Sequence, residues 1–386
     1  MKNYFRSRIF KGFFRYLGFF VLTGIFPVGC NLTESKAEEI PDSGRLTLMT
    51  WNIHNLFDGN DNGFEYDEYL VSAGWSSEKY KGRLNAISSA IEKIDPRPDI
   101  FILQEVESLL ILEDIAGCLS GGYLFSHFAG NPGAALGVGI ISRFPILEAR
   151  VHTITVNKDT TPRPVLEARI EAANPANPED SAQGEFVIFA CHWKSKLGGD
   201  DVTESVRRAS ARAILRRIRE LRETEPDIGV IVAGDLNENH NEFYRRGASS
   251  ICALLPDDPY CAQLTGCVNQ EGKANPGKQM DFIVISKNKP PAPVHFPDEA
   301  VVLFSPWLRD LENGSYYYKH NWETIDHFLV SSQFFDNKNW DYEKTTIVNI
   351  QPFANSGGIP SSYNIKTGSG LSDHLPLLLE LKNCRQ

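Results

Sequence analysis

The sequence predicts an α/β fold in which a mixed β-sheet is covered by helices. Short apolar runs bounded by turn residues recur along the chain, as buried strands do. Two longer segments, 80–94 and 202–222, carry apolar residues at helical spacing. The chain has 386 residues, of which 42% are hydrophobic and 23% charged, so it can bury a large core.

The expected strands alternate with these two helices and with hairpin-like pairs, which favours a mixed sheet between helices. They cover residues 46–51, 99–103, 137–142, 146–156, 165–170, 186–190, 229–233, 282–285, 325–330 and 377–381. Residues 251–310 are rich in Pro, Gly, Asn and Cys and are expected to form an irregular insertion. The predicted domain covers residues 45–384.

The N-terminus differs from the rest of the chain. Five cations without an acid precede an apolar run, residues 16–28, that is too short to span a bilayer. This order predicts an export signal over residues 1–29, followed by a tether over 30–44. The run ends before Cys30 and resembles a bacterial lipoprotein signal, which implies lipidation of Cys30. The alternative, a buried N-terminal helix, would leave five cations without counter-charges.

Export predicts a protein outside the cytoplasm, either a membrane-anchored lipoprotein or a periplasmic or extracellular protein. It also permits disulfides, and one short-range bridge is expected among Cys252, Cys261 and Cys267. The net charge of −10 excludes a global basic field for nucleic acid. A phosphate-bearing substrate therefore requires local cations or a bound metal.

The apolar run 229–233 stops at Gly234 and is followed by Asp235 and Asn237. Residues two apart on a strand project to the same side, so a carboxylate and a carboxamide are expected together at the rim of a sheet. Such oxygen atoms suit a hard cation such as Mg²⁺. A simple Asx turn at the end of a strand is the alternative.

Polar residues recur at the ends of the other expected strands, and one by one each is ordinary for a turn or cap. They are Asn52, Glu105, His192, Asp326 and the run Ser372-Asp373-His374. Taken together, the set resembles the endonuclease/exonuclease/phosphatase superfamily, the DNase I-like metal-dependent phosphodiesterases. The matching segments are TWNIHNLF (50–57), PDIFILQEVE (98–107), GVGIISRFP (137–145), CHWKSK (191–196), GDLN (234–237), WETIDHFLVS (322–331) and SDHLP (372–376).

The resemblance implies a four-layer sandwich, with two mixed β-sheets packed face to face and helices on the outside. It also implies metal-binding roles for Asn52, Glu105 and Asp373. Asp235 and Asn237 match the pair that orients the attacking water and holds the phosphoryl group. His374, polarised by Asp326, and His192 match the two catalytic histidines. The expected cofactor is Mg²⁺ or Mn²⁺.

The acidic partner of His374 has two candidates. Asp281 also begins a strand-like segment, but the aromatic segment 314–322 that precedes Asp326 favours Asp326. Arg143, Lys194 and Lys196 are candidate phosphate contacts, and ordinary solvated charge is the alternative for each.

The predicted function is divalent-metal-dependent phosphodiester hydrolysis, with nucleic acid as the favoured substrate. A sphingomyelinase-like or inositol-phosphate phosphoesterase is the alternative, because one fold can serve several substrates. A non-catalytic surface binding protein is disfavoured, because the expected residue type fills each catalytic position. The expected partners are the substrate and, through the N-terminal lipid, a membrane. No obligate protein partner is indicated.

Overall fold

The computed structural model describes residues 44–156, 161–172, 184–271, 273–275, 278 and 280–384. The chain divides into two units, Met1–Ser35 and Lys36–Gln386, and every described residue belongs to the second. The predicted signal over residues 1–29, Cys30 and nearly all of the tether lie outside the described residues. Export and lipidation therefore stay predictions.

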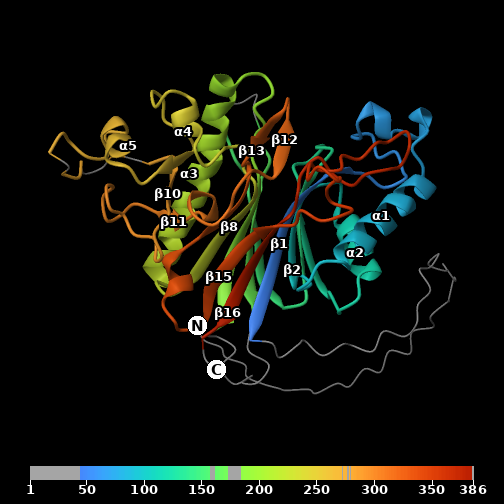
Figure 1. Ribbon diagram of the computed structural model, residues 1–386, viewed down its shortest axis with the longest axis horizontal. Helices are drawn as coiled ribbons and strands as arrows, with labels where there is room; N and C mark the ends of the chain where they lie inside the picture. The colour runs from blue at the N-terminus through green and yellow to red at the C-terminus, as the bar shows by residue number, and fades with distance from the viewer. Residues whose placement is uncertain are drawn as a thin grey trace, which may run out of the picture. The chain divides into compact units, whose positions relative to one another are not determined.

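The described chain forms two large mixed β-sheets and a small hairpin (Figure 1). The six-stranded sheet has the order β15 (Trp340–Ile347), β16 (Leu377–Asn383), β1 (Arg45–Leu56), β2 (Ile100–Val106), β4 (Gly137–Ser142) and β3 (Phe125–Ala129). The eight-stranded sheet has the order β5 (Ile146–His152), β6 (Val165–Glu171), β7 (Glu185–His192), β8 (Gly229–Asp235), β14 (Asp326–Val330), β11 (Val302–Phe304), β10 (Ile283–Ser286) and β9 (Leu254–Pro256). The hairpin pairs β12 (Tyr316–Tyr318) with β13 (Asn321–Glu323).

Apolar side chains from the two sheets form one core between them. Leu48, Ile102 and Leu379 of the six-stranded sheet belong to the same buried cluster as Ile188 and Ala233 of the eight-stranded sheet. Alternate residues of a strand point to opposite faces, and the outward-facing residues of both sheets, such as Leu103 and Val232, are also apolar and need a cover. The helices provide that cover.

The described α-helices are α1 (Ser77–Ile91), α2 (Leu109–Cys118), α3 (Asp200–Thr224), α4 (Glu242–Arg245) and α5 (Pro259–Leu264). The short 3-10 helices are η1 (Asp67–Tyr69), η2 (Val71–Ala73), η4 (Pro306–Leu308) and η5 (Ser332–Phe335). Helices α1 and α2 bury apolar side chains against β1 and β2, and α3 does so against β7 and β8. Figure 1 shows α1 and α2 on one side of the sheets and α3 on the other. The four-layer sandwich expected from the sequence is thus confirmed.

The two predicted helices are present with small shifts at their ends. Helix α1 begins after Ser76, whose side chain accepts a hydrogen bond from Lys79 N and so caps the helix. Helix α3 begins with Asp200 and Asp201, whose charges favour the positive end of the helix dipole. Helix α2 is not predicted, because its four consecutive apolar residues 109–112 obscure a helical period.

The predicted insertion over 251–310 contributes regular structure to the eight-stranded sheet. It supplies β9, β10 and β11, which lie beyond β14 at one edge. The short-range disulfide expected there is wrong, because Cys252, Cys261 and Cys267 are free thiols. All three pack in an apolar cluster with Phe243 and Phe282.

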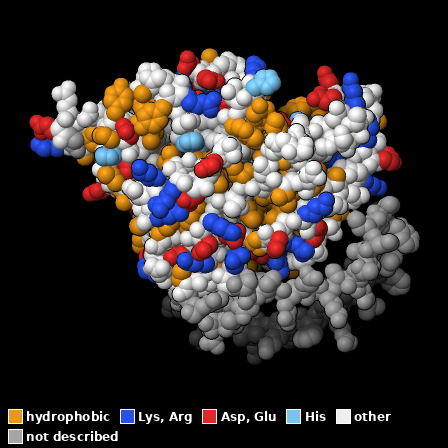
Figure 2. Space-filling view, viewed as in Figure 1, with side chains coloured by type: hydrophobic (Ala, Val, Ile, Leu, Met, Phe, Trp, Pro, Cys, Tyr) orange, Lys and Arg blue, Asp and Glu red, His pale blue; other side chains and the backbone are white. Residues whose placement is uncertain are grey.

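Two further properties bear on partners. Among the described residues, no helix combines the length and the apolar character that crossing a membrane requires. Figure 2 shows basic and acidic side chains interspersed over the lower part of the visible face, without a continuous basic stripe there. This pattern agrees with the absence of a global basic field that the net charge of −10 predicts.

Candidate active site

Three neighbouring strands bring distant residues side by side at one end of the eight-stranded sheet. In the parallel pair β7 and β8, His192 lies opposite Asp235. In the antiparallel pair β8 and β14, Asp326 lies opposite the same Asp235. His192 Nε2 is 3.5 Å from Asp235 Oδ2, and Asp235 is only 2% exposed. Register alone therefore places one carboxylate between a histidine and a second carboxylate.

The six-stranded sheet contributes Asn52, where the register of β1 shifts against β2, and Glu105, near the end of β2. Asn52 Nδ2 lies 3.1 Å from Glu105 Oε1 and also 3.1 Å from Asp235 Oδ2. The amide thus joins the two sheets across the site. Its oxygen accepts a hydrogen bond from His54 N. Asn52 thus bridges the two carboxylates through its amide nitrogen, and the metal-binding role predicted for it stays a prediction.

The backbone around these residues has an uncommon conformation. His54, Asn55, Glu105 and Asn237 all have positive φ angles, between 50° and 62°. Such angles are uncommon outside glycine and cluster where a structure fixes functional side chains. At Glu105 the conformation lets Oε2 accept a hydrogen bond from Asn55 N at 2.9 Å.

His374 forms a buried pair with Asp326. Its Nδ1 lies 2.8 Å from Asp326 Oδ2, and the same oxygen accepts a hydrogen bond from Ser315 Oγ at 2.6 Å. The ring of Tyr316 stacks on His374 with centroids 4.6 Å apart. Asp326 is 1% exposed, so its charge acts on the imidazole with little screening by water.

These surroundings leave one of the two histidines charged and the other neutral. Burial alone would lower the pKa of His374, but the charge and hydrogen bond of Asp326, with Asp373 and Asp235, raise it to about 10. His374 is therefore protonated at neutral pH. Burial lowers the pKa of His192 well below 6.5, and the charges of nearby cations add to this effect, so His192 is neutral.

Asp235 and Asn237 form the Asx turn that the sequence allows, and they also lie at this site. Asn237 N donates to Asp235 Oδ1 at 2.9 Å, and Asn237 Nδ2 donates to Trp193 O at 3.2 Å. Burial raises the pKa of Asp235 to about 7, although the charge of His374 opposes the rise. The turn and the site are thus one structure.

The residues present fit a divalent cation. Asp235 is a buried carboxylate whose raised pKa indicates that its charge is incompletely compensated. Glu105 is joined to it through Asn52 and remains partly exposed. Asp373 is about one-third exposed and lies 3.6 Å from His54 Nδ1. Carboxylate oxygens of this kind are ligands that Mg²⁺ and Mn²⁺ accept.

The three predicted phosphate contacts have different surroundings in the structure. Arg143 forms a buried pair with Asp99 at 3.0 Å, at the end of β2 opposite Glu105, so its prediction is wrong. Lys196 pairs closely with Glu242 and lies 3.9 Å from Glu323, which neutralise its charge. Lys194 follows His192 and Trp193 and remains a candidate.

Asp281, the alternative acidic partner for His374, forms a different ion pair. Asp281 forms a two-oxygen ion pair with Arg208 of α3, at 2.7 and 2.8 Å. Asp326, which the sequence favours, is the residue that lies against His374.

Three residues at the site are not predicted from the sequence. Arg163 donates to Trp193 O at 3.3 Å, Tyr316 covers His374, and Ser315 donates to Asp326. Ser315 and Tyr316 belong to the aromatic segment noted before Asp326, which was the available signal. Arg163 follows an irregular stretch and carries no local signal.

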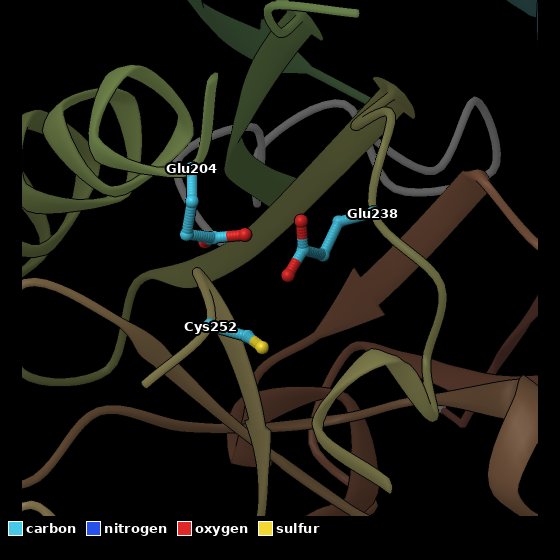
Figure 3. A group of neighbouring side chains, drawn as sticks. All are labelled: Glu204, Glu238 and Cys252. Atoms are coloured by element: carbon cyan, nitrogen blue, oxygen red, sulfur yellow. The ribbon is translucent and has the colours of Figure 1, made fainter. Parts of the chain in front are cut away.

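A second acidic cluster has a different character. Glu204, Glu238 and Cys252 point toward one another in Figure 3 and are buried. Arg207 donates to Glu238 at 2.6 Å and to Glu204 at 2.8 Å, and Arg246 donates to Glu204 at 2.9 Å. Two guanidinium groups thus neutralise the two carboxylates. This cluster is an ion-pair network between α3 and the residues that follow β8.

Sequence comparison identifies the family. The model of the endonuclease/exonuclease/phosphatase family matches residues 47–246, about half of the chain. The chain belongs to this family. The match includes Asn52, Glu105, His192, Asp235 and Asn237. No curated protein matches the sequence.

Several solved structures resemble this member of the endonuclease/exonuclease/phosphatase family. A family protein from Bacteroides thetaiotaomicron is 17% identical, with a TM-score of 0.48, and covers 87% of this chain and 94% of that one. D. rerio TDP2 in complex with single-strand DNA product is 13% identical, with a TM-score of 0.48 and coverage of 88% and 99%. The mannosyl-6-phosphatase Bt3783 of B. thetaiotaomicron is 16% identical, with a TM-score of 0.47 and coverage of 87% and 99%.

Proposed function

We propose that the protein is a divalent-metal-dependent phosphodiesterase that cleaves nucleic acid outside the cytoplasm. The observation that carries the proposal is the position of Asp235. It lies between neutral His192 and the Asp326–His374 pair, and Asn52 joins it to Glu105. A base, an acid and a cation-binding carboxylate are thus supported in one site.

The two ionisation states suggest a division of labour. Asp235, a buried carboxylate 3.5 Å from His192 Nε2, can accept the proton of an attacking water. The imidazolium of His374 can donate a hydrogen bond to a phosphate oxygen, because Asp326 keeps it protonated. Neutral His192 can donate from one ring nitrogen to another phosphate oxygen without adding charge. Asn237, fixed by its bond to Trp193 O, can hold the phosphoryl group.

Glu105 and Asp373 would hold the cation, and Asp235 would lie beside it. A bound Mg²⁺ or Mn²⁺ would neutralise phosphate charge and polarise the phosphorus–oxygen bonds. Asn52 would keep the carboxylates of Glu105 and Asp235 in register.

The proposal is tested with purified residues 40–386 on duplex DNA, single-stranded DNA, RNA, sphingomyelin, phosphoinositides and a generic phosphodiester. We expect cleavage of nucleic acid that stops in excess chelator and returns with Mg²⁺ or Mn²⁺. His374→Ala should lower kcat by about 10²- to 10⁴-fold with an unchanged circular dichroism spectrum. Full activity in excess chelator would refute the mechanism, and a clear preference for sphingomyelin or phosphoinositides would favour the alternative substrates.

We also propose that the protein reaches its substrate as an exported lipoprotein. The cations and apolar run before Cys30 support this location. Cys30→Ala should move the full-length protein from the membrane fraction to the soluble fraction of cells. The same fractionation for wild type and variant would remove lipidation from the proposal.

A further inference from the structure

Arg163 lies next to the proposed site without an acidic partner. Its Nη1 donates to Trp193 O at 3.3 Å, and this oxygen also accepts from Asn237 Nδ2 at 3.2 Å. Its charge also acts on Tyr66 and on His192. In the part of the chain that the structure describes, no carboxylate forms an ion pair with Arg163. Its positive charge is therefore held at the site by neutral groups.

The backbone of Arg163 is fixed in place. Pro162 and Pro164 on its two sides are buried, and the carbonyl of Pro162 accepts a hydrogen bond from Asn131 Nδ2 at 2.8 Å. Proline restricts its own φ and the conformation of the residue before it. Little backbone conformational entropy is therefore lost when the guanidinium binds a ligand.

Lys194 supplies a second cation of the same kind. Its Nζ lies 3.3–3.4 Å from Ser195 O, Ser195 Oγ and Leu197 O, all of them uncharged. Burial, together with the charges of Arg163 and Arg207, lowers its pKa. No ion pair with a carboxylate is found for it within the described residues. Lys196, two residues later, differs because Glu242 and Glu323 pair with it.

The charge of Arg163 acts on Lys194, and among the described residues neither cation forms an ion pair with a carboxylate, so both remain available to an anion. We propose that Arg163 and Lys194 form a subsite that binds a second phosphate of the substrate, next to the phosphodiester that is cleaved. The assignment of the substrate as a phosphodiester rests on the proposed function.

This subsite defines a class of substrates. Nucleic acids and inositol polyphosphates carry a further phosphate close to the reacting one, and a planar guanidinium binds phosphate through paired hydrogen bonds. A choline phospholipid instead presents a quaternary ammonium beside its phosphodiester, which the two cations would repel. The subsite therefore favours polyanionic substrates over sphingomyelin.

Three dinucleotides test the subsite directly. TpT contains one phosphodiester, whereas pTpT and TpTp add a terminal phosphate at either end. Binding to the metal-free protein in chelator, where turnover is prevented, is measured by ligand-observed nuclear magnetic resonance. We expect wild type to bind at least one terminally phosphorylated form roughly tenfold more tightly than TpT, since a charge-assisted contact contributes about that much.

Arg163→Gln should abolish this preference, and Lys194→Gln should reduce it. Arg212→Gln, which removes one exposed charge from α3, is the matched control and should keep it. Equal binding of the three dinucleotides by wild type, or an undiminished preference in Arg163→Gln, would overturn the proposal.

Failure of the proposed function gives a different result. If wild type shows the binding preference but cleaves none of the dinucleotides with Mg²⁺, the subsite stands and the phosphodiesterase proposal is at fault. If it cleaves all three and binds them equally, the phosphodiesterase proposal stands and the subsite is wrong.

Discussion

At the scale of single residues, one carboxylate determines the charge of the site. Asp326 accepts hydrogen bonds from His374 and Ser315 and is shielded from water. It keeps His374 protonated, whereas burial, with the charges of nearby cations, keeps His192 neutral. Pairs of titratable groups with opposed ionisation commonly mark the acid and base of an active site.

This reasoning gives a paired prediction. Asp326→Asn should lower kcat by about 10²- to 10⁴-fold, because the imidazolium loses its counter-charge. Asp281→Asn should leave kcat unchanged and cost about 1 kcal/mol at most, because Asp281 forms a partly exposed pair with Arg208, whereas Asp326 is the carboxylate that bonds to His374. Steady-state kinetics and urea unfolding measure both effects. The opposite ranking of the two variants would show that Asp281 acts in catalysis.

At the scale of elements, the close approach of β7 and β8 aligns His192 with Asp235. Gly234 has a φ of 134°, and a Cβ at this position would lie 2.0 Å from Cys191 O. A side chain cannot fit there without moving one strand away from the other. Only glycine allows this register next to the site.

Two glycine substitutions test this account. Gly234→Ala should lower the free energy of unfolding by at least about 2 kcal/mol and also reduce activity, since Asp235 must shift. Gly82→Ala lies in the exposed face of α1, where no atom is within 4 Å, and should raise stability by about 0.5–1 kcal/mol. Urea unfolding of both variants measures the effect. A neutral Gly234→Ala would contradict the packing argument.

At the scale of the whole molecule, two sheets meet to build the site. β1 and β2 carry Asn52 and Glu105, β7, β8 and β14 carry His192, Asp235 and Asp326, and the loop before β16 carries His374. The core between the sheets holds these strand ends in place. Stability of the folded domain is therefore a condition for the chemistry.

The folded domain should lose stability in mild acid. His327 is buried, and its Nε2 bonds to Glu238 O at 2.8 Å, whereas its Nδ1 has no partner. Burial lowers its pKa from 6.5 to about 4. Between these pH values the unfolded chain binds a proton that the folded chain does not, so stability falls as the pH decreases.

His327→Gln removes the titrating group and can keep a donor toward Glu238 O. Urea unfolding from pH 7 to pH 4 should show a smaller loss of unfolding free energy in the variant than in wild type. At pH 4 the two losses should differ by about 3 kcal/mol. His240, whose pKa burial also lowers to about 4, contributes in the same direction in both proteins. Identical pH dependence in the two proteins would contradict this assignment.

Much of the site was predictable from the sequence because its residues stand next to recognisable strands. Glu105, His192 and Asp235 each end an apolar run, and the positions of such runs are set by local pattern. The phosphate-contact prediction for Arg143 was wrong, because the sequence shows that Arg143 follows a strand but not at which end of the sheet that strand ends. Arg163 was missed because its approach to Trp193 depends on contacts between segments far apart in the chain.

The sequence by itself determined the family, the alternation of strands and helices, and the types of residue that end the strands. Local propensity and periodicity encode these properties, so they can be read without coordinates. Only the tertiary structure decided that Asp326 partners His374, that Asn52 bridges two carboxylates, and that Arg163 lies beside them with no acidic partner among the described residues. These properties depend on register, burial and the angle at which two sheets meet, and such long-range contacts leave no local mark in a sequence.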